Sequence, residues 1–144
     1  MILLSGPNLS GNELKYVTDC IKTGWVSSVG SYVSDFERSI SKYVGSKYAV
    51  ATSSGTTALH LSLITSDVGF NDYVIVPNIT FIATLNSIKY TNANPILIDI
   101  DPNTWQLDLN LLIKFLDTKT RVVDGKCIFK ENGRTIKALI PVHV

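Results

Sequence analysis

The sequence is poor in the features that mark several specialised classes of protein. Cys20 and Cys127 are its two cysteines among 144 residues, and neither has a CxxC or CxxH neighbour. This scarcity argues against a disulfide framework and against a metal site, and it favours a reducing compartment. No apolar run approaches the ~20 residues of a membrane span, and the apolar start of the chain is too short for a signal peptide. We therefore expect a cytoplasmic protein that does not bind a membrane.

An excess of charge of one sign is lacking as well. The sequence has 13 basic and 12 acidic residues, a formal net charge of +1 at pH 7, and its basic residues are scattered. Such a chain builds no field that would attract nucleic acid. Apolar residues make up 45% of the sequence and charged residues 17%, which is typical of a globular chain long enough to bury a core.

Two helices are predicted in the first fifty residues. Ser10 and Glu13 have the spacing of a capping box, which predicts a helix start there, and Gly24 is expected to end that helix. Gly45 is expected to end the second helix in a left-handed conformation. Apolar residues recur at helical spacing in both segments: Leu14, Val17 and Ile21 in the first, and Val33, Phe36, Ile40 and Val44 in the second.

Strands and helices alternate in the rest of the chain. Short β-rich runs predict strands over 48–52, 73–76, 95–100 and 138–144. Helices are predicted after the first three of these strands, with Leu59 and Leu63 in the first, residues 81–90 in the second, and Asp108 as the cap of the third. Asn132-Gly133 predicts a hairpin between residues 127–130 and 134–137. This order predicts an α/β fold with a mostly parallel sheet and flanking helices.

The stretch ATSSGTTALHLSL, residues 51 to 63, places a hydroxyl-rich turn between a predicted strand and a predicted helix. In an open parallel sheet such a turn lies beyond the carboxyl end of the strand, where ligands bind. The free N–H groups of the helix start and the hydroxyls of the turn could hold a phosphate. The alternative is that Ser and Thr only cap the helix, as they do in many helices that bind nothing. The turn alone leaves both interpretations open.

Three longer strings carry a resemblance to a known family. They are TGWVSSVGSYVSDFERSISKYVGSKYAVATSSGTTALHLSL, VIVPNITFIATLNSIKYTNANPILIDIDPNTWQLD and IKALIPVHV. In this order and at these separations they closely resemble the amino-terminal part of the DegT/DnrJ/EryC1/StrS family of nucleotide-sugar aminotransferases, which depend on pyridoxal 5'-phosphate (PLP). The resemblance implies the amino-terminal part of the large domain of a fold type I PLP-dependent transferase, similar to aspartate aminotransferase. Within the family, GWVSSVGSYV and the hairpin look most like the branch that aminates C4 of a UDP-linked 4-keto-6-deoxy-N-acetylhexosamine.

The resemblance also implies roles for individual residues. It assigns the cofactor phosphate to the turn, the pyridine ring to an aromatic side chain, and the sugar nucleotide to a segment near the start of the chain. The residues are Gly55, Thr56 and Thr57 for the phosphate, Phe81 for stacking, and Trp25, Val26 and Ser27 for the substrate. Without the resemblance, Phe81 could equally be a core aromatic and Trp25 a packing residue after a helix stop.

Two other groups of polar residues invite a functional interpretation. Asp99 and Asp101 form a DxD, but in the family this string is a strand end and a turn, so we predict no metal there. His143 lies on the last predicted strand, where a lone histidine is more often satisfied in the core than catalytic.

The family's Schiff-base lysine and its pyridine-pairing aspartate follow the IPVHV strand, and the sequence stops at Val144. We therefore expect residues 1–144 to be an incomplete large domain, inactive by itself, of an enzyme that is a homodimer and takes its amino group from an amino acid such as glutamate. The alternative is a non-catalytic binding or interaction module derived from the family. The apolar strand predicted at 138–144 is expected to leave a bare sheet edge.

Overall fold

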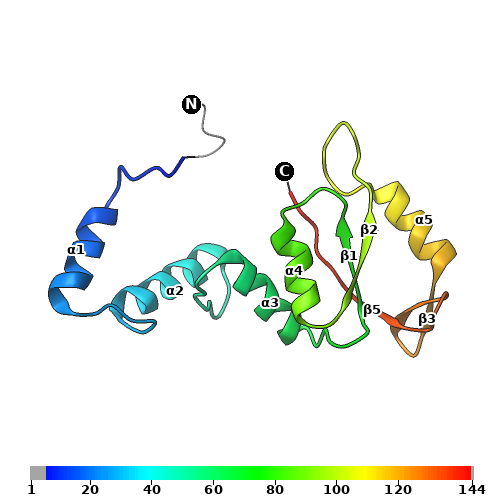
Figure 1. Cartoon of the computed structure of the whole chain (residues 1–144), viewed down its shortest axis with the longest axis horizontal. Helices are drawn as coiled ribbons and strands as arrows, with labels where there is room; N and C mark the ends of the chain where they lie inside the picture. Colours follow the sequence, from blue (N-terminus) through cyan, green and yellow to red (C-terminus); the bar gives the residue numbers. More distant parts are fainter. Residues whose placement is uncertain (1–5, 144) are drawn as a thin grey trace. The chain divides into compact units, whose positions relative to one another are not determined.

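The computed structural model describes residues 6–143 of the chain. These residues belong to two compact units, of which the first ends at Ala51 and the second begins at Thr52. Figure 1 shows the elements of each unit in sequence colours. Among the described residues, no helix is both long and apolar enough to cross a membrane.

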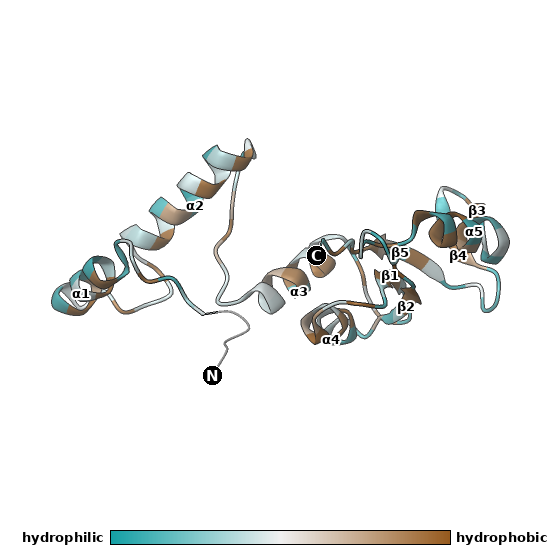
Figure 2. Ribbon diagram, turned by 90° about the horizontal axis from the view of Figure 1, so that it is seen from above, coloured by the Kyte–Doolittle hydropathy of each residue, from teal (hydrophilic) through white to brown (hydrophobic). Residues whose placement is uncertain are grey.

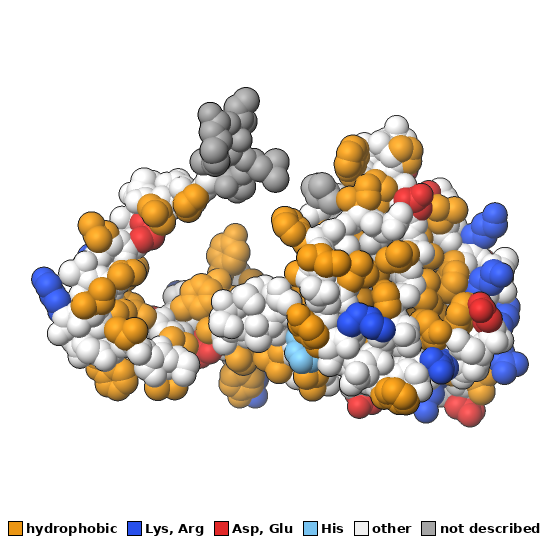
Figure 3. Space-filling view, in the orientation of Figure 1, with side chains coloured by type: hydrophobic (Ala, Val, Ile, Leu, Met, Phe, Trp, Pro, Cys, Tyr) orange, Lys and Arg blue, Asp and Glu red, His pale blue; other side chains and the backbone are white. Residues whose placement is uncertain are grey.

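The first unit consists of two helices, α1 (Glu13–Thr23) and α2 (Ser31–Val44). Gly24 and Gly45 follow them with φ of 74° and 71°, so both predicted left-handed stops are confirmed. No residue of either helix is buried within the described structure. Their apolar residues form stripes that Figure 2 shows in brown, and Figure 3 shows such side chains exposed on the surface. The described part of this unit, residues 6–51, therefore has no buried core.

The predicted capping box at the start of α1 is wrong. The N-cap is Asn12, and its side chain makes no capping hydrogen bond. Ser10 instead donates its hydroxyl to Asn8 Oδ1 at 2.7 Å, and the carboxylate of Glu13 accepts from the backbone N–H of Gly11 at 2.9 Å. The helix begins at Glu13, so Ser10 lies two residues before the N-cap position.

The second unit is built on a five-stranded sheet. Its strands are β1 (Tyr73–Pro77), β2 (Asn94–Ile98), β3 (Thr120–Val123), β4 (Lys126–Phe129) and β5 (Thr135–Leu139), in the order β2-β1-β5-β4-β3. β1 pairs in parallel with β2 and β5, whereas β4 pairs antiparallel with β3 and β5. The sheet is therefore mixed, with its parallel half at β2, β1 and β5.

Three helices complete the second unit. α3 (Gly55–Thr65) and α4 (Ile82–Tyr90) contribute Leu63 and Ile88 to one core, in which they pack with Val74 and Val76 of β1. α5 (Leu109–Lys119) packs against a second core that includes Ile75 of β1. Because Val74 and Ile75 are neighbours on one strand, they point to opposite faces, and β1 is covered on both.

Two strand predictions differ from the structure. Residues 48–52 form no strand, because the segment finds no partner strand among the described residues; the N–H of Ala51 donates to Glu37 Oε1 instead, at 2.8 Å. β3 is not foreseen, since its four residues have neither a clear alternation nor a turn signal before them.

The end of the chain is also organised differently. The segments predicted separately at 134–137 and 138–144 are one strand, β5, which ends at Leu139. β5 lies inside the sheet, so the fully bare edge expected there is wrong. β4 pairs with it at Thr135 and Ile136, however, and within the described residues Lys137 to Leu139 have a ladder on the β1 side alone. The predicted Asn-Gly hairpin between β4 and β5 is confirmed.

Candidate functional site

The first turn of α4 lies at the carboxyl edge of the parallel strands, because α4 follows β1 at the end where this strand stops. α3 leads into the start of β1 through residues 66–72, so its last turn lies at the opposite edge. The two helices pack against each other, as Figure 1 shows. Open parallel sheets bind their ligands at the carboxyl edge.

The turn before α3 is held by its own hydroxyl groups. Ser54 is the N-cap, and its Oγ accepts from the backbone N–H of Thr57 at 3.3 Å. The hydroxyl of Thr57 lies 3.0 Å from Ser54 Oγ and 3.4 Å from Ser53 Oγ. Thr52 donates its hydroxyl to the carbonyl of Ser54 at 3.0 Å. The capping interpretation is thus confirmed for Ser54, and it leaves the phosphate interpretation open for the residues after it.

These residues suit an anion such as the cofactor phosphate. The N–H groups of Gly55 and Thr56 belong to the first turn of a helix, where they have no intrahelical acceptor and carry partial positive charge. Apart from its chain neighbours and the backbone of α3, no atom of the described residues lies within 4 Å of the position that a Cβ on Gly55 would take, so a ligand can approach the backbone there. Thr57 is exposed and adds a hydroxyl donor. The chain therefore provides the donors and the space that a phosphate needs.

Phe81 is the N-cap of α4 and is 84% exposed. The alternative of a core aromatic is therefore wrong. The neighbouring Thr80 and Thr84 join their hydroxyls at 2.8 Å across the first turn of α4, which fixes the backbone on both sides of Phe81. An exposed aromatic ring at this edge is suited to stacking on a flat ligand.

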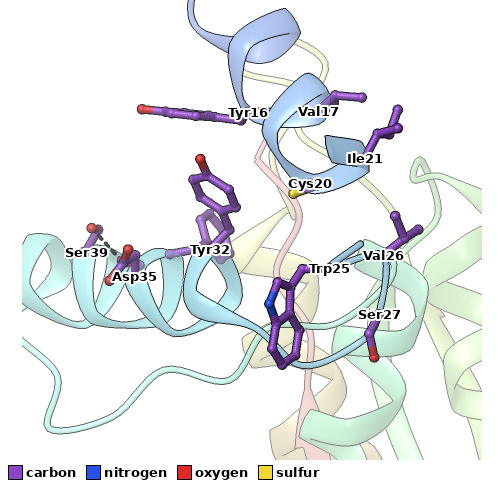
Figure 4. A pocket seen from close by; sticks show the side chains of 11 residues that line it. Tyr16, Val17, Cys20, Ile21, Trp25, Val26, Ser27, Tyr32, Asp35 and Ser39 are labelled. Carbon is purple, nitrogen blue, oxygen red and sulfur yellow. Dashed lines mark hydrogen bonds between the residues drawn. The ribbon is translucent and has the colours of Figure 1, made fainter. Parts of the chain in front are cut away.

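The three residues predicted for the substrate lie in the first unit. Trp25, Val26 and Ser27 line a groove of about 740 Å³ between α1 and α2, which Figure 4 shows from close by. The other lining residues come from the two helices: Tyr16, Val17, Cys20, Ile21, Tyr32, Asp35, Phe36 and Ser39. The groove is large enough for a small organic ligand.

Sequence reasoning missed the polar and aromatic side chains of this groove. Tyr16 and Tyr32 are in contact, with ring centroids 5.0 Å apart and ring planes tilted by 44°, and Tyr32 donates its hydroxyl to Asp19 Oδ2 at 3.0 Å. This hydrogen bond raises the pKa of Tyr32 above its ordinary value, because it stabilises the protonated phenol. The sequence contains a signal for these side chains, because Tyr16, Tyr32 and Asp35 lie next to the apolar residues that recur at helical spacing in α1 and α2.

The remaining candidates have structural partners. Asp101 Oδ1 accepts from the backbone N–H groups of Asn103 and Thr104, at 2.7 and 3.1 Å, and so holds a turn. Within residues 6–143, no cluster of three or more potential ligands could hold a metal ion. His143 is exposed, and its Nδ1 lies 2.9 Å from Gln106 Oε1, so the expectation of a core histidine is wrong.

Comparison with known proteins gives the class of the protein. The GDP-perosamine synthase of Caulobacter vibrioides is 43% identical over 99% of this chain and 34% of its own length. The UDP-4-amino-4-deoxy-L-arabinose–oxoglutarate aminotransferase of Shewanella sediminis is 29% identical over 83% of this chain and 31% of its own length. The chain thus spans about a third of the length of these relatives.

A solved structure extends the comparison to the fold and the cofactor. The GDP-4-keto-6-deoxy-D-mannose-3-dehydratase of Escherichia coli, determined with bound hydrated PLP, matches 85% of this chain and 31% of its own, with a TM-score of 0.70 and 26% identity. The expected fold class is confirmed. Fold and relatives together define the class of PLP-dependent sugar aminotransferases. The model of the DegT/DnrJ/EryC1/StrS aminotransferase family matches residues 7–144, and the chain belongs to this family.

Proposed function

We propose that the protein containing this chain is a PLP-dependent aminotransferase that converts a nucleotide-linked 4-keto-6-deoxy sugar to the 4-amino sugar. The product would serve in the synthesis of a surface polysaccharide or glycan. Support comes from the family and from the name of the Caulobacter relative, a GDP-perosamine synthase. The branch that the resemblance favoured, which aminates a UDP-linked 4-keto-6-deoxy-N-acetylhexosamine, is not specifically supported by the relatives named above.

The observation that carries this proposal is the first turn of α3. Gly55, Thr56 and Thr57 combine two helix-terminal N–H groups, an open approach and an exposed hydroxyl. Phe81 starts α4, the helix on which α3 packs, at the carboxyl edge of the sheet with its ring exposed. This pair of features fits a ligand with one phosphate and one flat ring.

PLP, when bound, supplies an electron sink that lets an amino group pass between an amino acid and a ketone. The residues of this chain bind and orient it in the proposal. The first turn of α3 would bind the phosphate dianion through its N–H groups and the Thr57 hydroxyl, and Phe81 would limit the tilt of the ring by stacking on one face. The lysine and the aspartate that the family uses for the chemistry are expected outside residues 1–144.

The amino donor in this proposal is glutamate. The printed name of the Shewanella relative includes oxoglutarate, the keto acid that glutamate becomes when it gives up its amino group. We also propose that the enzyme acts as a cytoplasmic homodimer, as the family resemblance implies.

The test is to remove one proposed phosphate contact. Replacing Thr57 by Val keeps the side-chain volume but deletes the hydroxyl, and we expect the Kd for PLP to rise about tenfold or more, because hydrogen bonds to charged groups are worth roughly 1.5–3 kcal/mol. Visible absorbance of the bound cofactor measures this. Thr65→Val is the matched control, since the Thr65 hydroxyl bonds the carbonyls of Leu61 and Ser62 in the last turn of α3. Equal affinities in the Thr57 variant and this control would contradict the assignment.

A non-catalytic module derived from the family is the alternative. It would retain the phosphate turn without moving an amino group. Formation of oxoglutarate from glutamate distinguishes the two functions. The enzyme produces it, whereas the module binds PLP or another phosphate and produces none.

A further inference from the structure

The wall of the groove in the first unit contains all three residues predicted for the sugar nucleotide. The family resemblance implies this role for Trp25, Val26 and Ser27, and the structure brings them together with residues of α1 and α2. Figure 4 shows the indole of Trp25 at the junction between the two helices.

The chemistry of the wall excludes two parts of a nucleotide sugar. None of the described residues that line the groove is Lys or Arg, so a diphosphate would find no cation there. The wall is mainly apolar and aromatic, so the many hydroxyls of a hexose would lose water without enough partners. A flat heteroaromatic base is different, because its faces are apolar and its edge has few polar groups. The aromatic walls favour such a base through stacking.

Among the described residues that line the groove, Asp35 is the one with a carboxylate. It stands on α2 five residues after Gly30, or about 7 Å along the helix axis, and the ring of Trp25 comes within 3.8 Å of the position of a Cβ on Gly30. Its side chain is 59% exposed and pairs with Arg38 at 3.1 Å in an i,i+3 contact, which is weak at the surface. A ligand could therefore replace Arg38 as the partner of Asp35.

We propose that this groove binds the nucleobase of the substrate and that Asp35 makes it selective for guanine. The N1–H and the N2 amino group of guanine are adjacent donors, which the two oxygens of a carboxylate can accept together. Uracil has one N–H between two carbonyl oxygens. The two oxygens would face the carboxylate of Asp35, and their partial negative charges would be repelled by it. Trp25 stacks on the base from the end of α1. This inference rests on the proposed function, in which the substrate is a nucleotide sugar.

Calorimetric titration of the purified protein with GDP, IDP and UDP tests the proposal. IDP lacks the N2 amino group and otherwise matches GDP. We expect GDP to bind about tenfold or more tightly than IDP, because one hydrogen bond to a charged group is lost, and UDP to bind more weakly still. Asp35→Asn should weaken GDP binding by a similar factor and bring the three affinities close together.

Arg38→Gln is the matched control, because it removes the ion pair but leaves the carboxylate. This variant should bind GDP at least as well as the wild type. Equal affinities for the three nucleotides, an unchanged GDP affinity in Asp35→Asn, or no nucleotide binding would each overturn the proposal. PLP binding, measured on the same samples, reports on the proposed function separately, since neither Asp35 nor Arg38 belongs to the phosphate turn.

Discussion

Phe81 shows how exposure changes the interpretation of a single side chain. A large apolar residue at the start of a helix is commonly part of a core, yet this ring is 84% exposed. We expect Phe81→Ala to raise the Kd for PLP about fivefold through lost stacking, on the order of 1 kcal/mol beyond the buried area. Cofactor fluorescence measures the affinity, and the melting temperature should stay nearly constant because little burial is lost.

Phe70→Ala provides the comparison for that variant. Phe70 is 79% exposed and lies in the segment between α3 and β1, before β1 begins, whereas Phe81 follows the other end of that strand. Its removal should leave PLP affinity unchanged. If both variants bind PLP as the wild type does, Phe81 has no role in cofactor binding.

Lys137 on β5 and Asp67 after α3 form an ion pair with the Nζ and Oδ2 atoms 2.7 Å apart. Their hydrogen bond lowers the pKa of Asp67 below 3.8 and raises the pKa of Lys137 above 10.5. Because the pKa of Asp67 is depressed in the folded state, the ion pair stabilises the fold fully at pH values above the ordinary carboxyl pKa. This stabilisation is lost as the pH falls through the depressed pKa of Asp67. Because the pKa of Lys137 is raised in the folded state, the same stabilisation is fully present at pH values below the ordinary amine pKa. It is lost as the pH rises through the raised pKa of Lys137.

We therefore expect Asp67→Asn to lower the free energy of unfolding by a small, constant amount between about pH 5 and 9. The difference from the wild type should shrink below about pH 4 and above about pH 10. Urea unfolding across this range measures it, with Lys137→Met and the double variant completing a thermodynamic cycle. A difference that does not change between pH 3 and pH 7 would show that the ion pair does not cause it.

Among the elements, α5 has the best defined N-cap. Asp108 Oδ1 accepts from the backbone N–H groups of Asn110 and Leu111, at 2.8 and 3.1 Å. Asp108→Ala should lower the free energy of unfolding by about 1 kcal/mol, as N-cap deletions do. Asp117→Ala, in the last turns of the same helix, should be neutral or slightly stabilising because its charge opposes the helix dipole there. Chemical denaturation that finds equal losses in both variants would contradict this role for Asp108.

The elements also show which structure a sequence can predict. α2, α3 and α5 follow from local signals, namely apolar spacing, Ser54 and Asp108 as caps, and Gly45 as a stop. The β4–β5 hairpin follows from Asn132-Gly133 for the same reason. A strand depends on a partner elsewhere in the chain, so the β-rich segment 48–52 was misjudged and β3 was missed.

The candidate site was predictable to different degrees for a related reason. The phosphate turn combines a helix start and hydroxyls within a few residues, so sequence alone suggested it. The exposure of Phe81 depends on how α4 meets the sheet, and the groove at Trp25 depends on how α1 meets α2. No local sequence pattern predicts either of these packing contacts. The family resemblance supplied these residues where spacing could not.

At the scale of the whole molecule, the described residues leave apolar side chains and part of a strand edge exposed. α1 and α2 contain no buried residue among those described, and β5 has a ladder on one side alone beyond Ile136. The chain spans about a third of the length of its relatives. The activity proposed here is therefore assigned to the protein as a whole and should be measured on it.

The most direct measurement is amino transfer by the protein expressed from its complete open reading frame. With PLP, L-glutamate and a GDP-linked 4-keto-6-deoxy sugar, we predict equal amounts of 2-oxoglutarate and of the 4-amino sugar nucleotide, detected by coupled absorbance and by mass spectrometry. The UDP-linked substrate, assayed in parallel, tests the nucleotide. A protein that binds PLP yet forms no 2-oxoglutarate with either sugar nucleotide would contradict the account.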